Sequence, residues 1–129
     1  VLNVKLKYYE KDLKLRQEVA SKYTKAIKTK NQKLETPFIS DKCTSAWAQY
    51  SIRVKNRDEL QRYLLDNEIQ TLIHYPIPPH KQNSYKEWNN ESYEISEKIH
   101  NEALSLPISG VQSFEDTIKI TNLIDNFNK

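Results

Sequence analysis

The segment that decides the fold is "AWAQYSIRVKNRDELQRYLLDNEIQTLIHYP", residues 46–76, because it predicts a strand, a helix and a second strand in succession. Every second side chain of residues 46–54 is apolar, which is the pattern of a half-buried strand. The apolar face carries Ala48, Tyr50, Ile52 and Val54. The opposite face carries Trp47, Gln49, Ser51 and Arg53. This second face is polar enough to line a site.

A helix and a second strand follow directly. Asn56 and Glu59 resemble a capping box, which predicts the start of a helix at this point. Its apolar side chains are Leu60, Tyr63 and Leu64. We expect the helix to end near Asn67, which tolerates the left-handed backbone of a C-terminal cap. Residues 69–75, "IQTLIHY", predict the second strand, and Pro76 ends it because proline has no N–H for the ladder.

Upstream, residues 1–30 predict one long amphipathic helix. Side chains of one stripe recur every three or four positions, and neither proline nor glycine occurs before Pro37. The stripe contains Leu2, Leu6, Tyr9, Leu13, Arg16, Ala20, Tyr23 and Ile27. A coiled coil is the competing interpretation, but the stripe covers only about four heptads and has Arg16 in its middle.

The start of this stripe leads to two further expectations. The pattern is already present at residue 2, no N-cap residue precedes it, and the chain contains no methionine. We therefore expect the chain to be an excerpt of a longer protein. We also expect the chain to self-associate, because an apolar stripe exposed to water tends to be buried against another copy of itself. The side chains concerned are Leu2, Leu6, Tyr9 and Leu13.

Downstream of residue 76 the sequence predicts short elements. A short helix is expected through Tyr85 and Trp88. A further helix is expected to begin at Ser96 and to carry Ile99, Ala103 and Leu104. Residues 104–108, "LSLPI", predict a third strand that Pro107 ends, and Gly110 marks a turn. Ser113 and Asp116 start a final helix. Its core face is expected to contain Ile120, Leu123, Ile124 and Phe127.

Together these elements predict an α+β fold with two layers, in which helices pack on a small three-stranded sheet. The chain of 129 residues suits a single domain, residues 1–129. Within it we expect a long connecting helix, residues 1–30, and a sheet-and-helix body, residues 46–129.

Composition narrows the class of protein. Hydrophobic residues make up 37% and charged residues 29% of the chain, which is typical of a soluble globular protein rather than a disordered one. No apolar run is long enough to cross a bilayer, so no membrane role is expected. The lone Cys43 cannot form an internal disulfide, which favours a cytoplasmic location, and it has no recognisable nucleophile setting.

Residues 1–33 are rich in lysine, and this charge has two interpretations. It could form a surface that faces phosphate or nucleic acid, or it could be the solvated side of a long helix. The second is favoured because lysine dominates over arginine and because the aromatic residues are not interleaved with the charges, as base stacking would require. No nucleic-acid partner is therefore expected.

The candidate binding residues lie in "LIHYPIPPHK", residues 72–81. Pro76, Pro78 and Pro79 stiffen the chain where it leaves the second strand, and stiffness here fixes the directions of nearby side chains. Those side chains are His74, Tyr75, His80 and Lys81. The two histidines have no third ligand nearby in sequence, so no metal site is expected. His74 and Tyr75 could bind a ligand, or local contacts could satisfy them at the strand end.

A resemblance bears on this choice. Residues 45–85, "SAWAQYSIRVKNRDELQRYLLDNEIQTLIHYPIPPHKQNSY", followed by "EKIHNEALSLPIS", resemble the C-terminal domain of DegT/StrS sugar-nucleotide aminotransferases, which depend on pyridoxal phosphate. The upstream "VKLKYYEKDLKLRQEVASKY" fits the same family. The most similar members aminate the C3 keto group of a dTDP-linked 3-keto-6-deoxyhexose. The paired blocks "HYPIPPH" and "LSLPIS" make this resemblance specific.

The resemblance implies a parent enzyme in which a separate large domain binds pyridoxal phosphate through a lysine and in which two copies form a homodimer. That large domain is absent here, so we expect no catalytic residue in this chain and no cofactor bound to it. The amino donor would be an amino acid such as glutamate, and the acceptor a keto-deoxysugar nucleotide used in surface polysaccharide biosynthesis. His74 and Tyr75 match residues that reach the nucleotide-sugar, with His80 and Lys81 as secondary candidates.

Two positions depart from the family pattern. Many relatives have histidine where this chain has Ala48, which puts a role for that position in doubt. They commonly have glycine where this chain has Glu68, so we expect the turn to depend on Asn67. A stand-alone basic α+β binding or interaction domain without catalytic activity is the alternative function.

Overall fold

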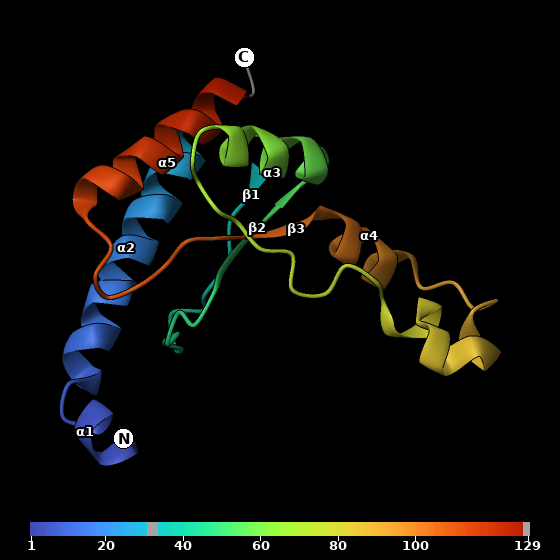
Figure 1. Ribbon diagram of the computed structural model, residues 1–129, viewed down its shortest axis with the longest axis horizontal. Helices are drawn as coiled ribbons and strands as arrows, with labels where there is room; N and C mark the ends of the chain where they lie inside the picture. The colour runs from blue at the N-terminus through green and yellow to red at the C-terminus, as the bar shows by residue number, and fades with distance from the viewer. Residues whose placement is uncertain (31–33, 128–129) are drawn as a thin grey trace.

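The computed structural model describes residues 1–30 and 34–127 (Figure 1). The helices are α1 (Leu2–Leu6), α2 (Tyr9–Lys30), α3 (Arg57–Asp66), α4 (Glu94–Glu102) and α5 (Phe114–Phe127). The strands are β1 (Leu34–Glu35), β2 (Tyr50–Val54) and β3 (Ala103–Leu106). Two short 3₁₀ helices, η1 (Pro79–Lys81) and η2 (Asn83–Trp88), lie between α3 and α4. The predicted α+β class is confirmed.

The strands form one antiparallel sheet in the order β1-β2-β3. In its register Tyr50 lies opposite Leu106, and Ile52 lies opposite Leu104. Side chains alternate across a strand, so these apolar pairs share one face. Tyr50, Ile52 and Val54 are buried while Ser51 and Arg53 between them are half-buried, which confirms the predicted two-faced strand.

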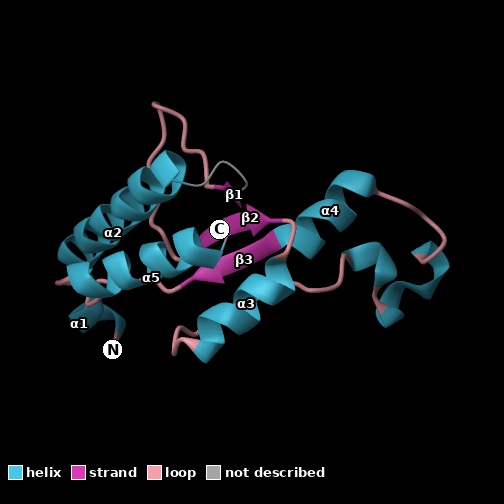
Figure 2. Cartoon of the chain, turned by 90° about the horizontal axis from the view of Figure 1, so that it is seen from above, coloured by secondary structure: helices cyan, strands magenta, loops and turns pink. Residues whose placement is uncertain are grey.

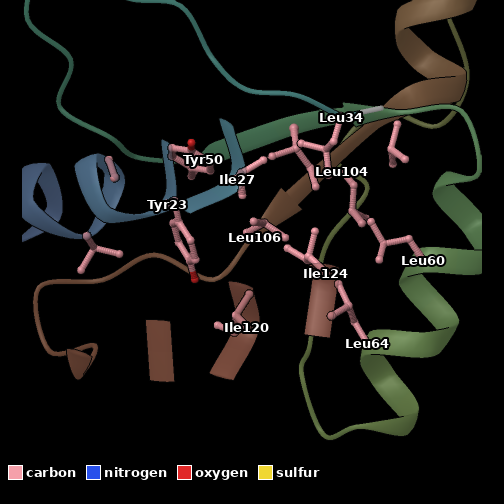
Figure 3. Close-up of a cluster of buried hydrophobic side chains, with 14 residues drawn as sticks. Tyr23, Ile27, Leu34, Tyr50, Leu60, Leu64, Leu104, Leu106, Ile120 and Ile124 are labelled. Carbon is pink, nitrogen blue, oxygen red and sulfur yellow. The ribbon is translucent and has the colours of Figure 1, made fainter. Parts of the chain in front are cut away.

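Helices α2, α3 and α5 cover the buried face of the sheet (Figure 2). Figure 3 shows the side chains of the strands directed toward those of the helices. The labelled core residues are Tyr23, Ile27, Leu34, Tyr50, Leu60, Leu64, Leu104, Leu106, Ile120 and Ile124. The predicted core face of α5 is confirmed, with Ile120 and Ile124 buried and Leu123 and Phe127 packed at its edge.

The predicted long helix is two helices, because the chain turns at Lys7 and Tyr8 between α1 and α2. Its stripe changes character along its length. Leu2 is 76% exposed, whereas Tyr23 is fully buried against the sheet. The core residues of α2 begin at Val19, midway along the helix, and α2 as a whole packs against α5 and β1. Lys33 of the basic segment lies outside the described residues.

Several predicted boundaries are wrong, among them the start of α4, which is Glu94 rather than Ser96. The strand over residues 46–54 begins only at Tyr50, because Trp47 has a positive φ of 48° that is incompatible with a strand.

Residues 69–75 form no strand, only an isolated bridge from Leu72 to Ser105. Ala103 and Leu104 belong to β3 rather than to the preceding helix, because pairing with β2 outweighs their helical spacing. In place of residues 69–75 the sheet contains β1, a strand that the sequence did not indicate.

The end of α3 also differs from expectation. Asn67 has a negative φ of −99°, and Glu68 takes the left-handed conformation instead, with φ 66°. The Ile69 N–H donates to the Leu64 carbonyl at 2.8 Å, and the Glu68 N–H to the Leu65 carbonyl at 2.9 Å. This pair of bonds is a Schellman motif, which satisfies the last carbonyls of the helix. At the other end Asn56 is the N-cap residue but makes no side-chain capping bond, so the predicted capping box is not formed.

The loop into α5 follows the prediction. The Ser113 hydroxyl accepts the Asp116 N–H at 2.9 Å, and the Asp116 carboxylate accepts the Ser113 N–H at 3.3 Å, which is a capping box. A Cβ at Gly110 would lie 2.0 Å from the Asp12 carboxylate on α2, so glycine here leaves room for that carboxylate in its pair with Arg16. Among the helices described, none combines the length and hydropathy needed to cross a membrane.

Candidate binding pocket

Residues 76–93, which we call the proline arm, leave the sheet and extend away from the body of the molecule (Figure 1). Polar side chains hold the arm in shape. The Asn89 side-chain amide donates to the carbonyls of His80, Gln82 and Tyr85, at 2.8, 3.4 and 3.2 Å. Tyr85 and Trp88 stack with ring centroids 5.0 Å apart. The prolines thus open an ordered segment rather than a loose loop.

His80 and Lys81 are part of this scaffold. The His80 side chain is only 5% exposed, and its Nε2 lies 2.8 Å from the Glu97 carboxylate. That hydrogen bond, followed by one from the Tyr93 N–H, lowers the pKa of Glu97 below its usual value. Lys81 donates to the carbonyls of Asn89 and Glu91 at 2.9 and 2.8 Å. Neither residue lines the pocket of His74 and Tyr75, and their predicted substrate role stays untested.

His74 and Tyr75 lie where the arm begins, and both line a pocket of about 180 Å³. Their ring centroids are 6.3 Å apart, and the Tyr75 side chain is largely exposed. Among the residues described, neither side chain has a hydrogen-bond partner. The structure therefore does not provide the local hydrogen bonds that would satisfy this pair at a strand end. Both rings are available to a ligand.

The remaining walls come from three other elements. The lining also includes Gln49, Ser51, Leu72, Ile73, Ile99, His100, Ala103 and Ser105. Ser51 of β2 and Gln49, just before this strand, belong to the face that the sequence marked as polar enough to line a site. His100 and Ser105 were not predicted, because only the bridge at Leu72 and the packing of α4 beside β2 bring them to this pocket. A histidine in the last turn of a helix directly before a strand was the one available signal.

The entrance to β2 is held by a polar contact from α2. Arg16 donates to the Trp47 carbonyl at 3.3 Å and to the Ile108 carbonyl at 3.5 Å, and it pairs with Asp12 at 2.8 Å. These bonds anchor Trp47 in its left-handed conformation, which costs free energy for a bulky residue. Ala48, the position that departs from the family pattern, follows directly and is exposed. The contact explains why an arginine interrupts the apolar stripe of α2.

The electrostatics of the pocket are simple. Its lining contains hydroxyl, imidazole and amide groups but no lysine, arginine, aspartate or glutamate. Beneath the sheet, burial raises the pKa of Tyr50 to about 12, so this residue stays neutral in the core. Within the described residues, no group of three or more histidine, cysteine, aspartate or glutamate side chains could hold a metal ion. Cys43 is exposed and lies outside the pocket.

Sequence relatives cover nearly the whole chain. The profile of the DegT/DnrJ/EryC1/StrS aminotransferase family matches residues 1–125. The chain is 43% identical to dTDP-3-amino-3,6-dideoxy-alpha-D-galactopyranose transaminase of Aneurinibacillus thermoaerophilus, over 98% of this chain and 34% of that protein. It is 33% identical to UDP-2-acetamido-2-deoxy-3-oxo-D-glucuronate aminotransferase of Pseudomonas aeruginosa, over 84% of this chain and 29% of that protein. The chain thus spans about a third of the length of these relatives.

The fold also matches a solved structure. The crystal structure of a DegT DnrJ EryC1 StrS aminotransferase from Brucella abortus superposes with a TM-score of 0.89 at 34% identity. The match covers 98% of this chain and 34% of that one. The similarity therefore includes the proline arm and the pocket as well as the sheet and its helices.

Proposed function

The chain belongs to the DegT/DnrJ/EryC1/StrS aminotransferase family, and from that membership we propose that it is the small C-terminal domain of a sugar-nucleotide aminotransferase. The full-length enzyme would transfer an amino group from an amino acid, glutamate in the first instance, to a keto-deoxysugar nucleotide. The observation that carries this proposal is the 43% identity with a dTDP-aminosugar transaminase over 98% of the chain. From the name of that relative we propose a dTDP-linked 3-keto-6-deoxyhexose as the substrate of the full-length enzyme.

The part of the reaction assigned to this chain is substrate binding. His74 and Tyr75 offer an imidazole and a phenol with no other partner among the described residues, at the mouth of a pocket. Both groups donate hydrogen bonds in their neutral forms, so they can bind sugar or phosphate oxygens at neutral pH. The stacked and hydrogen-bonded proline arm holds the backbone from which they project. This chain would therefore orient the substrate rather than carry out the chemistry.

The pocket does not suit pyridoxal phosphate, the cofactor that the family implies. That cofactor needs an amine to condense with, an acid beside its ring nitrogen and a group that binds its phosphate. The lining of the pocket contains no lysine and no carboxylate. We assign the cofactor to the part of the full-length protein outside these residues, and no catalytic residue to this chain.

Assembly and location follow from the same proposal. We assign the full-length enzyme to the cytoplasm, as a homodimer, in the biosynthesis of deoxyamino sugars for surface polysaccharides. For the chain as it stands, the exposed stripe of α1 and early α2 supports the predicted self-association, since Leu2, Leu6 and Tyr9 are at least half exposed. Sedimentation of a concentrated sample checks this, and a clean monomer would contradict it.

The experiment uses the full-length protein encoded by the reading frame that contains this chain. Single-turnover kinetics would follow amination of dTDP-3-keto-6-deoxyhexose separately from the reaction with glutamate. For His74→Asn and Tyr75→Phe we expect roughly ten- to a hundredfold lower kcat/KM for the sugar, because a polar substrate atom is left unpaired. The glutamate reaction should change less. A folding defect would lower both reactions and the Tm together.

Two outcomes would count against the proposal. A full-length protein that aminates no keto-sugar nucleotide would remove the aminotransferase assignment. Wild-type amination by both variants would leave the enzyme in place but remove His74 and Tyr75 from the binding site.

A further inference from the structure

His100 has a defined tautomer in this structure. Its Nδ1 lies 2.8 Å from the Ser96 carbonyl oxygen, one turn back along α4. A carbonyl oxygen can only accept a hydrogen bond, so Nδ1 must carry the proton. In the neutral ring the other nitrogen, Nε2, is then an acceptor.

The backbone of His100 is held as firmly as its ring. The guanidinium of Arg57, at the start of α3, donates to the His100 carbonyl. The Arg57 side chain is only 10% exposed and also bonds Asp58 at 2.8 Å, so it does not move freely. A cation at the C-terminal end of α4 also suits the helix dipole. The position of His100 is therefore set by two independent contacts.

The Nε2 atom of His100 has no hydrogen-bond partner within the part of the chain that the structure describes. It is not among the fully buried polar atoms that lack a partner, so a ligand can reach it. His100 is among the residues that line the same pocket as His74 and Tyr75, and it also lines the hollow beside α4 that contains Ser96 and Ile99. A preorganised acceptor thus remains without a partner, among the described residues, on a side chain that lines this pocket.

The rest of the pocket suits an uncharged hydroxylated ring. The Ser51 and Ser105 hydroxyls lie 2.8 Å apart, and one donates to the other. The accepting hydroxyl keeps its own hydrogen, which is a donor for a ligand. Leu72, Ile99 and Ala103 add apolar surface beside these groups. Because no lysine or arginine lines the pocket, a pyrophosphate would have no cation to pair with here.

We propose that this pocket binds the hexose ring of the substrate and that His100 Nε2 accepts a hydrogen bond from one of its hydroxyls. The inference rests on the proposed function for the identity of the sugar, and it assigns to His100 a role in choosing substrates with a hydroxyl at that position. His74 and Tyr75 at the mouth then contact the part of the substrate that continues toward the nucleotide.

The test uses NMR of the 129-residue chain and three probes: methyl α-D-fucopyranoside, dTDP-fucose and dTDP alone. Long-range imidazole ¹H–¹⁵N spectra should show His100 with a protonated Nδ1, and the Nε2 resonance should shift when either sugar is added. The dTDP arm should leave it unchanged. A shift with dTDP alone, or none with either sugar, would overturn the proposal.

Two variants separate the acceptor from the rest of the ring. His100→Asn keeps a donor near the position of Nδ1 but has nothing at Nε2, and we expect roughly three- to tenfold weaker sugar binding. His100→Gln keeps an acceptor near Nε2 and should bind within about twofold of the wild type. Equal binding by the wild type and His100→Asn would refute the assignment. If His100→Asn fails to fold, the shift of the wild-type Nε2 resonance on addition of sugar still tests the proposal.

These measurements require no transamination. Sugar binding that depends on His100, beside a full-length protein without aminotransferase activity, would overturn the proposed function and keep the sugar site. An active full-length enzyme whose C-terminal chain shows no sugar binding that depends on His100 would keep the proposed function and overturn the sugar site.

Discussion

The body of the molecule and the proline arm are ordered by different forces. The fourteen side chains that form the described core come from α2, α3, α5 and the strands, and none comes from residues 76–93. The arm keeps aromatic side chains at its surface, with Tyr85 40% and Trp88 49% exposed. It is held instead by Asn89, by Lys81 and by the pair of His80 and Glu97.

This difference separates stability from binding. Burial of apolar surface is non-directional and makes the body robust, whereas hydrogen bonds from a few side chains set the direction of a loop. The candidate pocket lies at the boundary, where His74 and Tyr75 leave the body and His100 lies in the last turn of α4. A change in the core should therefore affect the whole fold, and a change in the arm should affect mainly the pocket.

The largest effect is expected in the core. Leu104→Ala should lower the free energy of unfolding by about 2–5 kcal/mol, because Leu104 is fully buried between the sheet and the helices. Denaturant titration measures it. The matched control is Leu65→Ala, since Leu65 is 58% exposed on α3. Similar losses for the two variants would contradict the boundary between core and surface.

A smaller effect is expected for a polar group inside the body. The Tyr23 hydroxyl donates to the Pro107 carbonyl at 2.9 Å and accepts from Gln112 at 2.8 Å, and its burial raises the pKa of Tyr23. Tyr23→Phe removes the donor to the Pro107 carbonyl and leaves Gln112 with only its bond to Thr117 at 3.1 Å, so it should cost about 1–3 kcal/mol in thermal or denaturant unfolding. Tyr63→Phe is the control, because the Tyr63 hydroxyl has no partner among the described residues. An unchanged Tm for Tyr23→Phe would show that water replaces the hydroxyl.

The C-terminal end of α3 offers a stabilising change. Glu68 has φ 66°, a conformation that costs a side-chain-bearing residue free energy and glycine little. Glu68→Gly should raise the free energy of unfolding by about 0.5–1 kcal/mol, since the ion pair with Lys119 at 3.9 Å is exposed and weak. Asn67→Gly, at a negative φ, should not stabilise. Calorimetry distinguishes the two, and a lower Tm for Glu68→Gly would refute the argument.

The smallest global effect should come from the arm and depend on pH. The pKa of Glu97 is lowered in the folded state, chiefly by its bond to His80, so its stabilising contribution is complete above the ordinary value of 4.5. That contribution is lost as the pH falls through the lowered folded value. Near-UV circular dichroism of the Tyr85–Trp88 stack should report this loss in acid while the body stays folded. Glu97→Gln should abolish the transition and Glu94→Gln should keep it. An acid transition unaltered by Glu97→Gln would contradict this origin.

Much of the fold follows from local patterns in the sequence. Alternation identified the buried face of β2, and the Ser113–Asp116 pair identified the start of α5, because each signal lies within a few neighbouring residues. The strand β1 could not be found this way, since its two residues carry no pattern and become a strand only by pairing with Arg53 and Val54. The segment 69–75 shows the converse, because its strand-like pattern finds one bridge rather than a ladder.

The candidate pocket divides along the same line. His74, Tyr75 and the polar face of β2 were predicted, because prolines and alternation are visible in the sequence itself. The tertiary structure alone decided that His80 is buried against Glu97 and that His100 lines the pocket. It also placed the left-handed conformation on Glu68 rather than Asn67. Local patterns record the preferences of neighbouring residues, whereas these outcomes depend on contacts between residues far apart in the chain or on the Schellman bonds that close α3.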